Sequence, residues 1–293
     1  MKKCLLLSIL SLLCSLCDAQ NPIFVQDSLK LISSQFKFTE GVSVDQHGNI
    51  FFTDQPNDQI WKYDTDGKLS LYMAQSGRAN GTYFDKKGNL IVCADENNQI
   101  WSIDKHKKVS VLFSDFEGKK VNGPNDLWLD AKGGIYFTDP YYQRDYWTRQ
   151  KPEIEKQRVY YLPKGKKTAI IVADDLSKPN GIVGTPDGKF LYVADMDANK
   201  TYRYQINADG SFTDRQTICL QHSDGMTLDS NGNIYLTGKG VTIYKPTGEK
   251  IGHIDVPEDW CGNVCFGGKN KDVLFIAASK SIYKIKTSAK GVE

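Results

Sequence analysis

The sequence lacks the signatures of several large functional classes. Its formal net charge is only +2, and its Lys and Arg residues are scattered, without the basic stripe and interleaved aromatic residues that favour nucleic-acid binding. It contains no G-x-S-x-G elbow and no P-loop, so a serine hydrolase and a nucleotide-binding enzyme lack support. We therefore expect no nucleic-acid partner and no nucleotide.

The sequence also has no apolar run long enough for a membrane span. The N-terminal run Leu5–Leu16 falls short of the roughly 20 residues that a span needs. It follows Lys2 and Lys3 and precedes small residues, which is the pattern of a secretory signal peptide. The sequence thus predicts a signal peptide over residues 1–19 and a soluble, periplasmic or secreted protein over residues 20–293.

Four cysteines lie beyond the predicted signal peptide. Two of them, Cys261 and Cys265, lack the second Cys or His pair that a zinc site would need. An oxidising compartment permits disulfides, but a domain of this size does not require them. We expect these cysteines to be small buried side chains.

One segment recurs six times along the chain. In residues 121–139, VNGPNDLWLDAKGGIYFTD, a polar residue is followed by a short apolar strand, a tight turn and a second strand. In every copy the polar residue lies five positions before the residue that opens the turn. The six pairs are Glu40/Asp45, Asn80/Asp85, Asn125/Asp130, Asn180/Thr185, Asp224/Asp229 and Asn263/Gly268.

The repeats predict an all-β fold. In the first repeat we expect strands at 41–45, 50–54, 59–64 and 68–74. Four short strands per unit, a period of about 40 to 57 residues and Gly-bearing turns are typical of a β-propeller. Six repeats predict one domain over residues 20–293, a six-bladed β-propeller with four-stranded antiparallel blades. The alternating segment LISSQFKF is expected to pair with the last repeat and close the ring of blades.

The polar residues of the repeats should meet at the axis. The first strand of each blade lines the central channel, so equivalent positions form a ring of two carboxylates and four amides. These oxygens cannot all satisfy one another, and a hard divalent cation would resolve this. Ca²⁺ is favoured, with Mg²⁺, Mn²⁺ or Zn²⁺ as alternatives, although the ring lacks the His and thiolate that zinc prefers. A water-filled polar channel is the other interpretation.

Aspartates at the ends of the second strands should lie further from the axis. Register about the turns places Asp54 opposite Glu40 and Asp139 beside Asn125. Such residues could cap the following loop. Asp139 also precedes an insertion, residues 140–158, whose Tyr and Trp residues predict an ordered lid, so substrate contact is the alternative for Asp139.

Three further polar residues lie near the ring. Asp126 follows Asn125 and should point into the blade interface, as a structural carboxylate or as a base behind the ring. His222 lies two residues before Asp224, at the channel mouth, where it is either a surface residue or a proton carrier. Asn122 could shape a turn or reach a sugar hydroxyl.

These motifs carry a resemblance to a known family. TEGVSVD, NGPNDLWLD, FTDP, KPNGI, SDGMTLD and NVCFGG occur in order and resemble the gluconolactonase/regucalcin/luciferin-regenerating-enzyme-like family of six-bladed propellers, the bacterial gluconolactonases above all. The resemblance implies a metal held by Glu40, Asn125, Asn180 and Asp224. It also implies that Asp224 is a catalytic acid/base. One departure is Gly123, because regucalcin-like members have a substrate-binding Arg there.

The resemblance implies a metal-dependent lactonase that hydrolyses a gluconolactone-like sugar lactone to the aldonic acid. A cation lowers the pKa of a carboxylate bound to it. Asp224 must then act at a pH well above its pKa, through a metal-bound water, or Asp126 or His222 must share the proton transfer. Hydrolysis of organophosphates at the same site and a non-catalytic, calcium-stabilised binding propeller are the alternatives. We expect a monomer or weak dimer. The residues expected to face substrate are Asn80, Asn122, Asp139 and Asn263.

Overall fold

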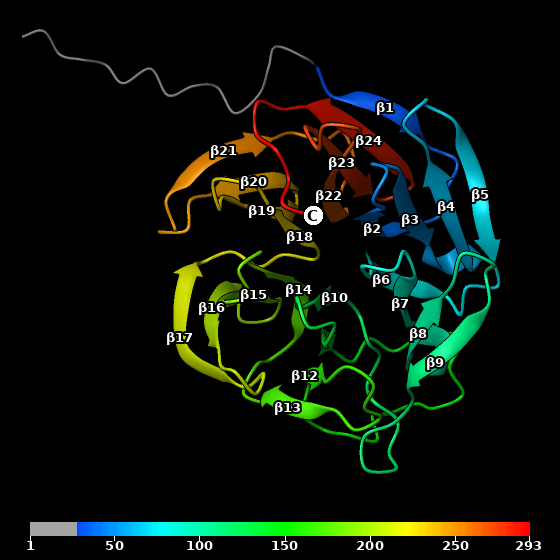
Figure 1. The fold of residues 1–293 in the computed structure, drawn as a ribbon, viewed down its shortest axis with the longest axis vertical. Helices are drawn as coiled ribbons and strands as arrows, with labels where there is room; N and C mark the ends of the chain where they lie inside the picture. Colours follow the sequence, from blue (N-terminus) through cyan, green and yellow to red (C-terminus); the bar gives the residue numbers. More distant parts are fainter. Residues whose placement is uncertain (1–27) are drawn as a thin grey trace, which may run out of the picture.

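The computed structural model describes residues 28–293, which form six four-stranded antiparallel sheets. Figure 1 shows the sheets arranged like blades around one axis, with the C-terminus near the centre. The six-bladed propeller predicted from the repeats is therefore confirmed. The predicted signal peptide, residues 1–19, lies outside the described residues.

Each blade places one strand at the axis and three progressively further out. The innermost strands of blades 1 to 6 are β2 (Thr39–Val44), β6 (Ala79–Phe84), β10 (Leu127–Leu129), β14 (Pro179–Gly184), β18 (Met226–Leu228) and β22 (Cys261–Gly267). The second strands are β3 (Ile50–Asp54), β7 (Leu90–Ala94), β11 (Ile135–Asp139), β15 (Phe190–Asp195), β19 (Ile234–Gly238) and β23 (Val273–Ala278). The third strands are β4 (Gln59–Tyr63), β8 (Gln99–Ile103), β12 (Arg158–Leu162), β16 (Lys200–Ile206), β20 (Gly240–Tyr244) and β24 (Ser281–Lys286). The outer strands are β5 (Leu69–Ala74), β9 (Val109–Phe113), β13 (Ile170–Ala173), β17 (Phe212–Cys219), β21 (Lys250–Ile254) and, in blade 6, β1 (Lys30–Ser33).

The outer strand of blade 6 comes from the N-terminal side of the chain. β1 pairs antiparallel with β24, and Lys30 lies opposite Lys284. The predicted closure by the segment LISSQFKF is confirmed. It joins the two ends of the described chain within one sheet, so the ring of blades has no gap at its seam (Figure 1).

The blades pack through apolar faces on both sides. The second strands are almost fully buried, as in Leu90–Ala94, because each is covered by the neighbouring blades. Aromatic rings fill the space between blades 3 and 4, where Tyr136 stacks on Tyr161 at 4.3 Å and on Phe212 at 5.5 Å. Such packing fixes the inner strands relative to one another.

The inner strands bulge close to their ring residues. In blade 1 the register shifts between Glu40 and Ser43, so Asp54 pairs with Thr39, and Glu40 pairs with Thr53. The expected Glu40/Asp54 pair is therefore wrong by one residue, because a bulge adds a residue to one strand only. Blades 2, 4 and 6 bulge at the equivalent place.

Two further expectations concern the cysteines and membrane spans. The four cysteines, Cys93, Cys219, Cys261 and Cys265, are free and buried, as expected. No helix among residues 28–293 is long and apolar enough to cross a membrane.

Candidate active site

Glycines next to the ring residues allow neighbouring blades to meet at the axis. A Cβ on Gly41 would overlap the backbone carbonyl of Asn80, and one on Gly181 would lie 2.7 Å from the carbonyl oxygen of Asp224. Only glycine permits so close an approach. The same relationship joins Gly81 to Asn125, Gly225 to Asn263, and Gly262 to Glu40. The six polar residues of the repeats thus lie on adjacent strands around one axis.

Blade 3 departs from the glycine pattern at Asp126. Its Oδ1 accepts a hydrogen bond of 2.9 Å from the backbone N–H of Leu127, and its carboxylate also accepts one from the backbone of Ile182 in blade 4. Asp126 therefore joins blades 3 and 4 at the position where blades 1, 2, 4 and 5 have a glycine. Burial raises its pKa to about 8. The expected position at the blade interface is observed.

The two ring carboxyls, Glu40 and Asp224, are close enough to affect each other. Burial, followed by the negative charge of Asp224, holds the pKa of Glu40 well above its usual range. Burial also raises the pKa of Asp224 to about 6, and hydrogen bonds from Trp260 and Asn180 limit that rise. The ring therefore concentrates negative charge in a poorly solvated place, where a cation would be strongly favoured.

The amide groups complete a set of oxygen donors. Asn180 Nδ2 donates to the hydroxyl of Tyr142 at 3.2 Å, while its buried Oδ1 has no hydrogen-bond partner. Among residues 28–293 no three His, Cys, Asp or Glu side chains gather into a metal-binding group, so any cation site here depends on amides. Carboxylate and amide oxygens suit Ca²⁺ and similar hard cations. The residues that fit this description are Glu40, Asn125, Asn180 and Asp224.

The other two ring amides differ from each other. Asn263 Oδ1 accepts a hydrogen bond of 2.7 Å from the backbone N–H of Val264, so this oxygen is already used. Asn80 is buried in the ring, and its backbone carbonyl accepts a hydrogen bond from Thr53. Both residues are buried beside the ring carboxyls, and their predicted contact with substrate stays a prediction.

Trp260 is a site residue that the sequence did not reveal. Its Nε1 donates to Asp224 Oδ2 at 2.6 Å, and its ring stacks against His222 with centroids 5.8 Å apart. The buried Nδ1 of His222 has no partner, and burial lowers the pKa of this imidazole. Trp260 precedes β22 in a loop outside the repeated segment. The sequence offered one signal for Trp260, which is that it is an aromatic residue three positions before Asn263.

The second-strand aspartates mostly cap loops. Asp139 is fully buried and accepts hydrogen bonds from the backbone N–H groups of Asn122 and Gly123, at 2.9 and 2.8 Å. Burial raises its pKa to about 7. These contacts contradict the expected substrate contact of Asp139, because both of its oxygens are turned into the loop. Asp54 and Asp195 cap the equivalent loops of blades 1 and 4.

Asn122 is likewise directed into the loop rather than toward the ring. Its Nδ2 donates to the carbonyl oxygen of Lys156 at 3.0 Å, and the whole residue is buried. Its buried Oδ1 has no hydrogen-bond partner among the described residues, so the contact with a sugar hydroxyl stays a prediction. The alternative, a turn-forming residue, agrees with these contacts.

Asp95 is the exception, because it holds the insertion of residues 140–158. Its Oδ2 accepts a hydrogen bond from Arg144 Nε at 2.9 Å and another from the hydroxyl of Tyr146. Trp147 Nε1 donates to the carbonyl oxygen of Asp95 at 3.0 Å. The loop that precedes β6 in blade 2 is capped instead by Asp58 of blade 1. The backbone N–H of Arg78 donates to Asp58 Oδ1 at 2.6 Å. The carboxylate of Asp95 is thus available to the insertion.

The insertion reaches the ring and covers the position of the missing family arginine. The hydroxyl of Tyr142 contacts Asn180, as described above. At Gly123, a Cβ would lie 2.9 Å from Asp95 Oδ1 and 3.0 Å from the ring of Trp147, so a larger side chain would need these neighbours to shift. Arg144, also on the insertion, is close enough for its charge to lower the pKa of both Glu40 and Asp224. The insertion therefore supplies a cation and a hydroxyl beside the ring.

Comparison with known proteins agrees with this geometry. A family model described as "SMP-30/Gluconolactonase/LRE-like region" matches residues 38–280. A gluconolactonase of Zymomonas mobilis is 28% identical over 298 residues, covering 91% of this chain and 83% of that protein. The solved structure of a gluconolactonase of Xanthomonas campestris has a TM-score of 0.83 at 25% identity, covering 88% of this chain and 89% of the other.

A more distant structure supports the fold alone. The calcium-binding protein regucalcin of Agrobacterium tumefaciens has a TM-score of 0.77 at 17% identity, and the match covers 90% of this chain and 95% of that one. Since the family model spans most of the described residues, the chain belongs to the SMP-30/gluconolactonase/LRE-like family.

Proposed function

We propose that this protein is a metal-dependent lactonase that hydrolyses a sugar lactone, gluconolactone-like in class, to the aldonic acid. The protein is a lactone hydrolase, as its family and its gluconolactonase relatives indicate. The observation that carries the metal dependence is the ring. Buried Glu40 and half-buried Asp224 form a pair of carboxyls beside Asn180, whose side-chain oxygen has no partner.

The ring supplies the ligands, and the cation supplies a Lewis acid. Bound by Glu40, Asn125, Asn180 and Asp224, a divalent ion such as Ca²⁺ would polarise the lactone carbonyl and stabilise the negative charge that develops on its oxygen. Mg²⁺, Mn²⁺ and Zn²⁺ are the alternatives to Ca²⁺.

Asp224 is the proposed general acid/base. It takes a proton from the attacking water and returns it to the alkoxide that leaves when the ring ester opens. Trp260 fixes Oδ2 of this carboxylate, which orients the group. His222, a neutral imidazole packed on Trp260, is placed to exchange the proton with solvent. Asp126 lies behind the ring, and its raised pKa makes it a carrier of a proton near neutral pH.

The insertion is the proposed lid and polyol contact. The hydroxyl of Tyr142 lies beside Asn180, where it can hydrogen-bond a sugar hydroxyl. Arg144 brings a cation that can stabilise the carboxylate of the product. By covering the channel mouth, these residues would also limit access of bulk water.

Export is part of the proposal. The predicted signal peptide at residues 1–19 supports a periplasmic or secreted enzyme. We further expect a monomer or weak dimer.

The test is Asp224→Asn assayed with a panel of aldonolactones. We expect loss of hydrolysis with an unchanged circular dichroism spectrum, while Asp255→Asn, a change at an exposed residue of the same blade, keeps full activity. The protein stripped of metal should be inactive and should recover when single cations are added back. Full activity of Asp224→Asn would refute its catalytic role. Turnover of phosphotriesters but not lactones would favour the organophosphate alternative, and no turnover at all would favour a binding propeller.

A further inference from the structure

A large cavity lies at the opposite end of the channel from the ring. It has a volume of about 880 Å³ and includes Asp45, Asp85 and Asp130, which open the turns of blades 1, 2 and 3. Each is five residues along its chain from a ring residue, and a strand rises about 3.3 Å per residue, so these turns lie about 16 Å from the ring. The cavity walls extend inward from the turns as far as Val42. The proposed lactone chemistry does not use this turn-face cavity.

The walls of the turn-face cavity are mainly apolar. Tyr83, Phe84, Leu112 and Leu129 line it and are only half-buried. A cavity of this size with apolar walls and a few polar groups is typical of small-molecule sites. The walls therefore favour an occupant with an apolar body.

The rim of the turn-face cavity is strongly basic. Seven lysines line it against four carboxylic acids. Three of these acids, Asp45, Asp85 and Asp130, each accept two backbone N–H groups of their own turns, so their charge is already engaged. Within residues 28–293 none of the seven lysines forms an ion pair. The lysines are Lys86, Lys87, Lys132, Lys164, Lys166, Lys167 and Lys271.

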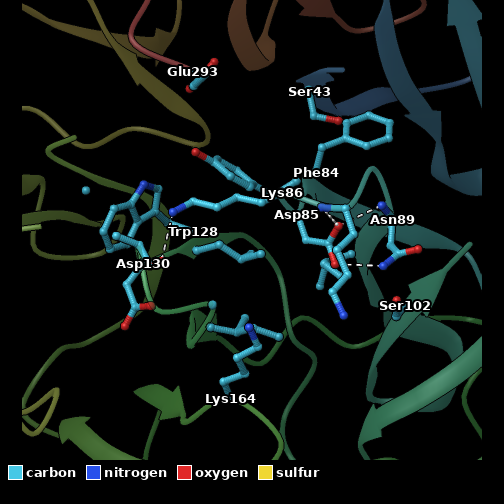
Figure 2. Close-up of a pocket in the computed structure, with 18 of the residues that line it drawn as sticks. Ser43, Phe84, Asp85, Lys86, Asn89, Ser102, Trp128, Asp130, Lys164 and Glu293 are labelled. Atoms are coloured by element: carbon cyan, nitrogen blue, oxygen red, sulfur yellow. Dashed lines mark hydrogen bonds between the residues drawn. The ribbon is translucent and has the colours of Figure 1, made fainter. Parts of the chain in front are cut away.

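Two of the lysines span the gap between blades 2 and 3. Lys86 Nζ donates to the carbonyl oxygen of Ala131 at 3.0 Å, and Figure 2 shows this side chain extending from Asp85 toward Trp128 and Asp130. Lys167 Nζ crosses in the other direction and donates to the carbonyl oxygen of Val111 at 2.6 Å. An ammonium group has three N–H donors, so each retains capacity for an anion.

We propose that the turn-face cavity binds an amphipathic carboxylate, with its alkyl chain against the apolar walls and its carboxylate at the lysine rim, where Lys86 and Lys167 offer N–H donors. Charge complementarity selects an anion, because the rim has more lysines than acids and the described residues form no ion pair with these lysines. The apolar walls select a chain of several carbons, because burying CH₂ groups is favourable and a simple anion would leave the walls wet. The site is independent of the lactonase proposal.

Isothermal titration with decanoate, below its micellar concentration and at constant ionic strength, tests the proposal on the whole protein. We expect saturable binding of one decanoate per chain. Decanol has the same chain without the charge and acetate has the charge without the chain, so both should bind at least tenfold more weakly. Saturating decanoate should leave the KM for a lactone unchanged, because the two sites lie at opposite ends of the channel.

Two double variants, each replacing two lysines by alanine, serve as the test and its control. Lys86→Ala with Lys167→Ala should weaken decanoate binding at least tenfold. Lys105→Ala with Lys250→Ala, which removes two exposed lysines outside the cavity, should not. Leu129→Glu, which places a carboxylate in the apolar wall, should also weaken binding. Absence of saturation, equal binding of decanol, an unaffected Lys86/Lys167 variant, or competition with the lactone would each overturn the proposal.

Discussion

The indole nitrogen of Trp260 lies 2.6 Å from Oδ2 of Asp224, and the same indole packs against His222. This contact links the proposed acid/base to the imidazole that could exchange its proton. It also explains part of the pKa of Asp224, since a hydrogen bond to a carboxylate favours the charged form.

Replacing Trp260 by Phe keeps an aromatic ring but removes the N–H donor. A hydrogen bond to a charged group contributes about 1.5–3 kcal/mol, so we expect kcat/KM for a lactone to fall about tenfold to a hundredfold. The pKa of Asp224 should rise, which moves the acidic limb of the pH profile upward. Trp61→Phe is the control, since Trp61 makes a similar bond to Gln59 on a third strand, away from the axis. An unchanged kcat/KM would contradict the assignment.

The anchor of the lid can be tested at Asp95. In Asp95→Ala the guanidinium of Arg144 loses the partner that lies 2.9 Å away, and a charge left buried without its partner is costly. Since Arg144 is partly exposed, we expect the free energy of unfolding, measured in urea, to fall by about 2–3 kcal/mol. This loss is smaller than that for a fully buried pair. Trypsin should also cleave faster after Arg149 within the lid, where Gln150 follows.

The matched control for the lid anchor is Asp174→Ala. Asp174 pairs with Lys156 at 2.6 Å, but both side chains are exposed, so the urea midpoint should stay the same. If both variants unfold alike, or if trypsin cleaves them at the same rate, Asp95 does not hold the lid.

The ring of polar residues could be predicted from the sequence because the six repeats align. Glu40 and Asp224 are far apart in the chain, yet both precede a turn by five residues, and this equivalence was enough to predict that they meet. Their mutual effect on pKa agrees with that prediction. The bulge beside Glu40 was not predictable from turn symmetry, so its expected partner was off by one residue.

Contacts made by loops outside the repeats escaped prediction. Trp260 and Arg144 have no equivalent in other blades, so alignment of the repeats gives no position for them. Asp139 shows the converse problem. Its place beside the insertion suggested substrate contact, but two backbone N–H groups were already available to it, and the carboxylate satisfies them first.

The close approach of blades 1 and 2 predicts that Gly41 cannot be replaced. Gly41 has φ +51°, and a Cβ there would overlap the carbonyl of Asn80. Gly41→Ala should therefore lower the free energy of unfolding by about 3 kcal/mol or more, beyond the roughly 1 kcal/mol that a left-handed alanine costs. In the control, Gly88→Ala, φ is +81° but nothing lies within 4 Å, so only the backbone cost should appear. Equal losses in the two variants, measured by urea unfolding, would argue against the close approach.

The ring carboxyls predict opposite effects of pH on the metal-free and metal-loaded protein. In the metal-free state the pKa of Asp224 is about 6 against an ordinary 3.8, and burial together with the charge of Asp224 raises the pKa of Glu40 well above its usual range. The folded protein then binds more protons than the unfolded chain between these values, so this contribution to stability is complete below pH 4 and is lost as pH rises through 6 and above. With Ca²⁺ the ligands must be deprotonated, so stabilisation by the ion should grow with pH.

Thermal melts of wild type and Glu40→Gln, from pH 4.5 to pH 8, with EDTA or with Ca²⁺, separate this effect from that of other carboxylates. In EDTA the melting temperature of the variant should rise relative to that of the wild type as pH rises, because the variant has no carboxylate at position 40 to bury. In Ca²⁺ the order should reverse, because the variant has lost a ligand. Glu249→Gln, at an exposed residue of blade 5, should follow the wild type in both series. Parallel curves for Glu40→Gln and wild type in EDTA and in Ca²⁺ alike would mean that Glu40 neither faces Asp224 nor holds a cation.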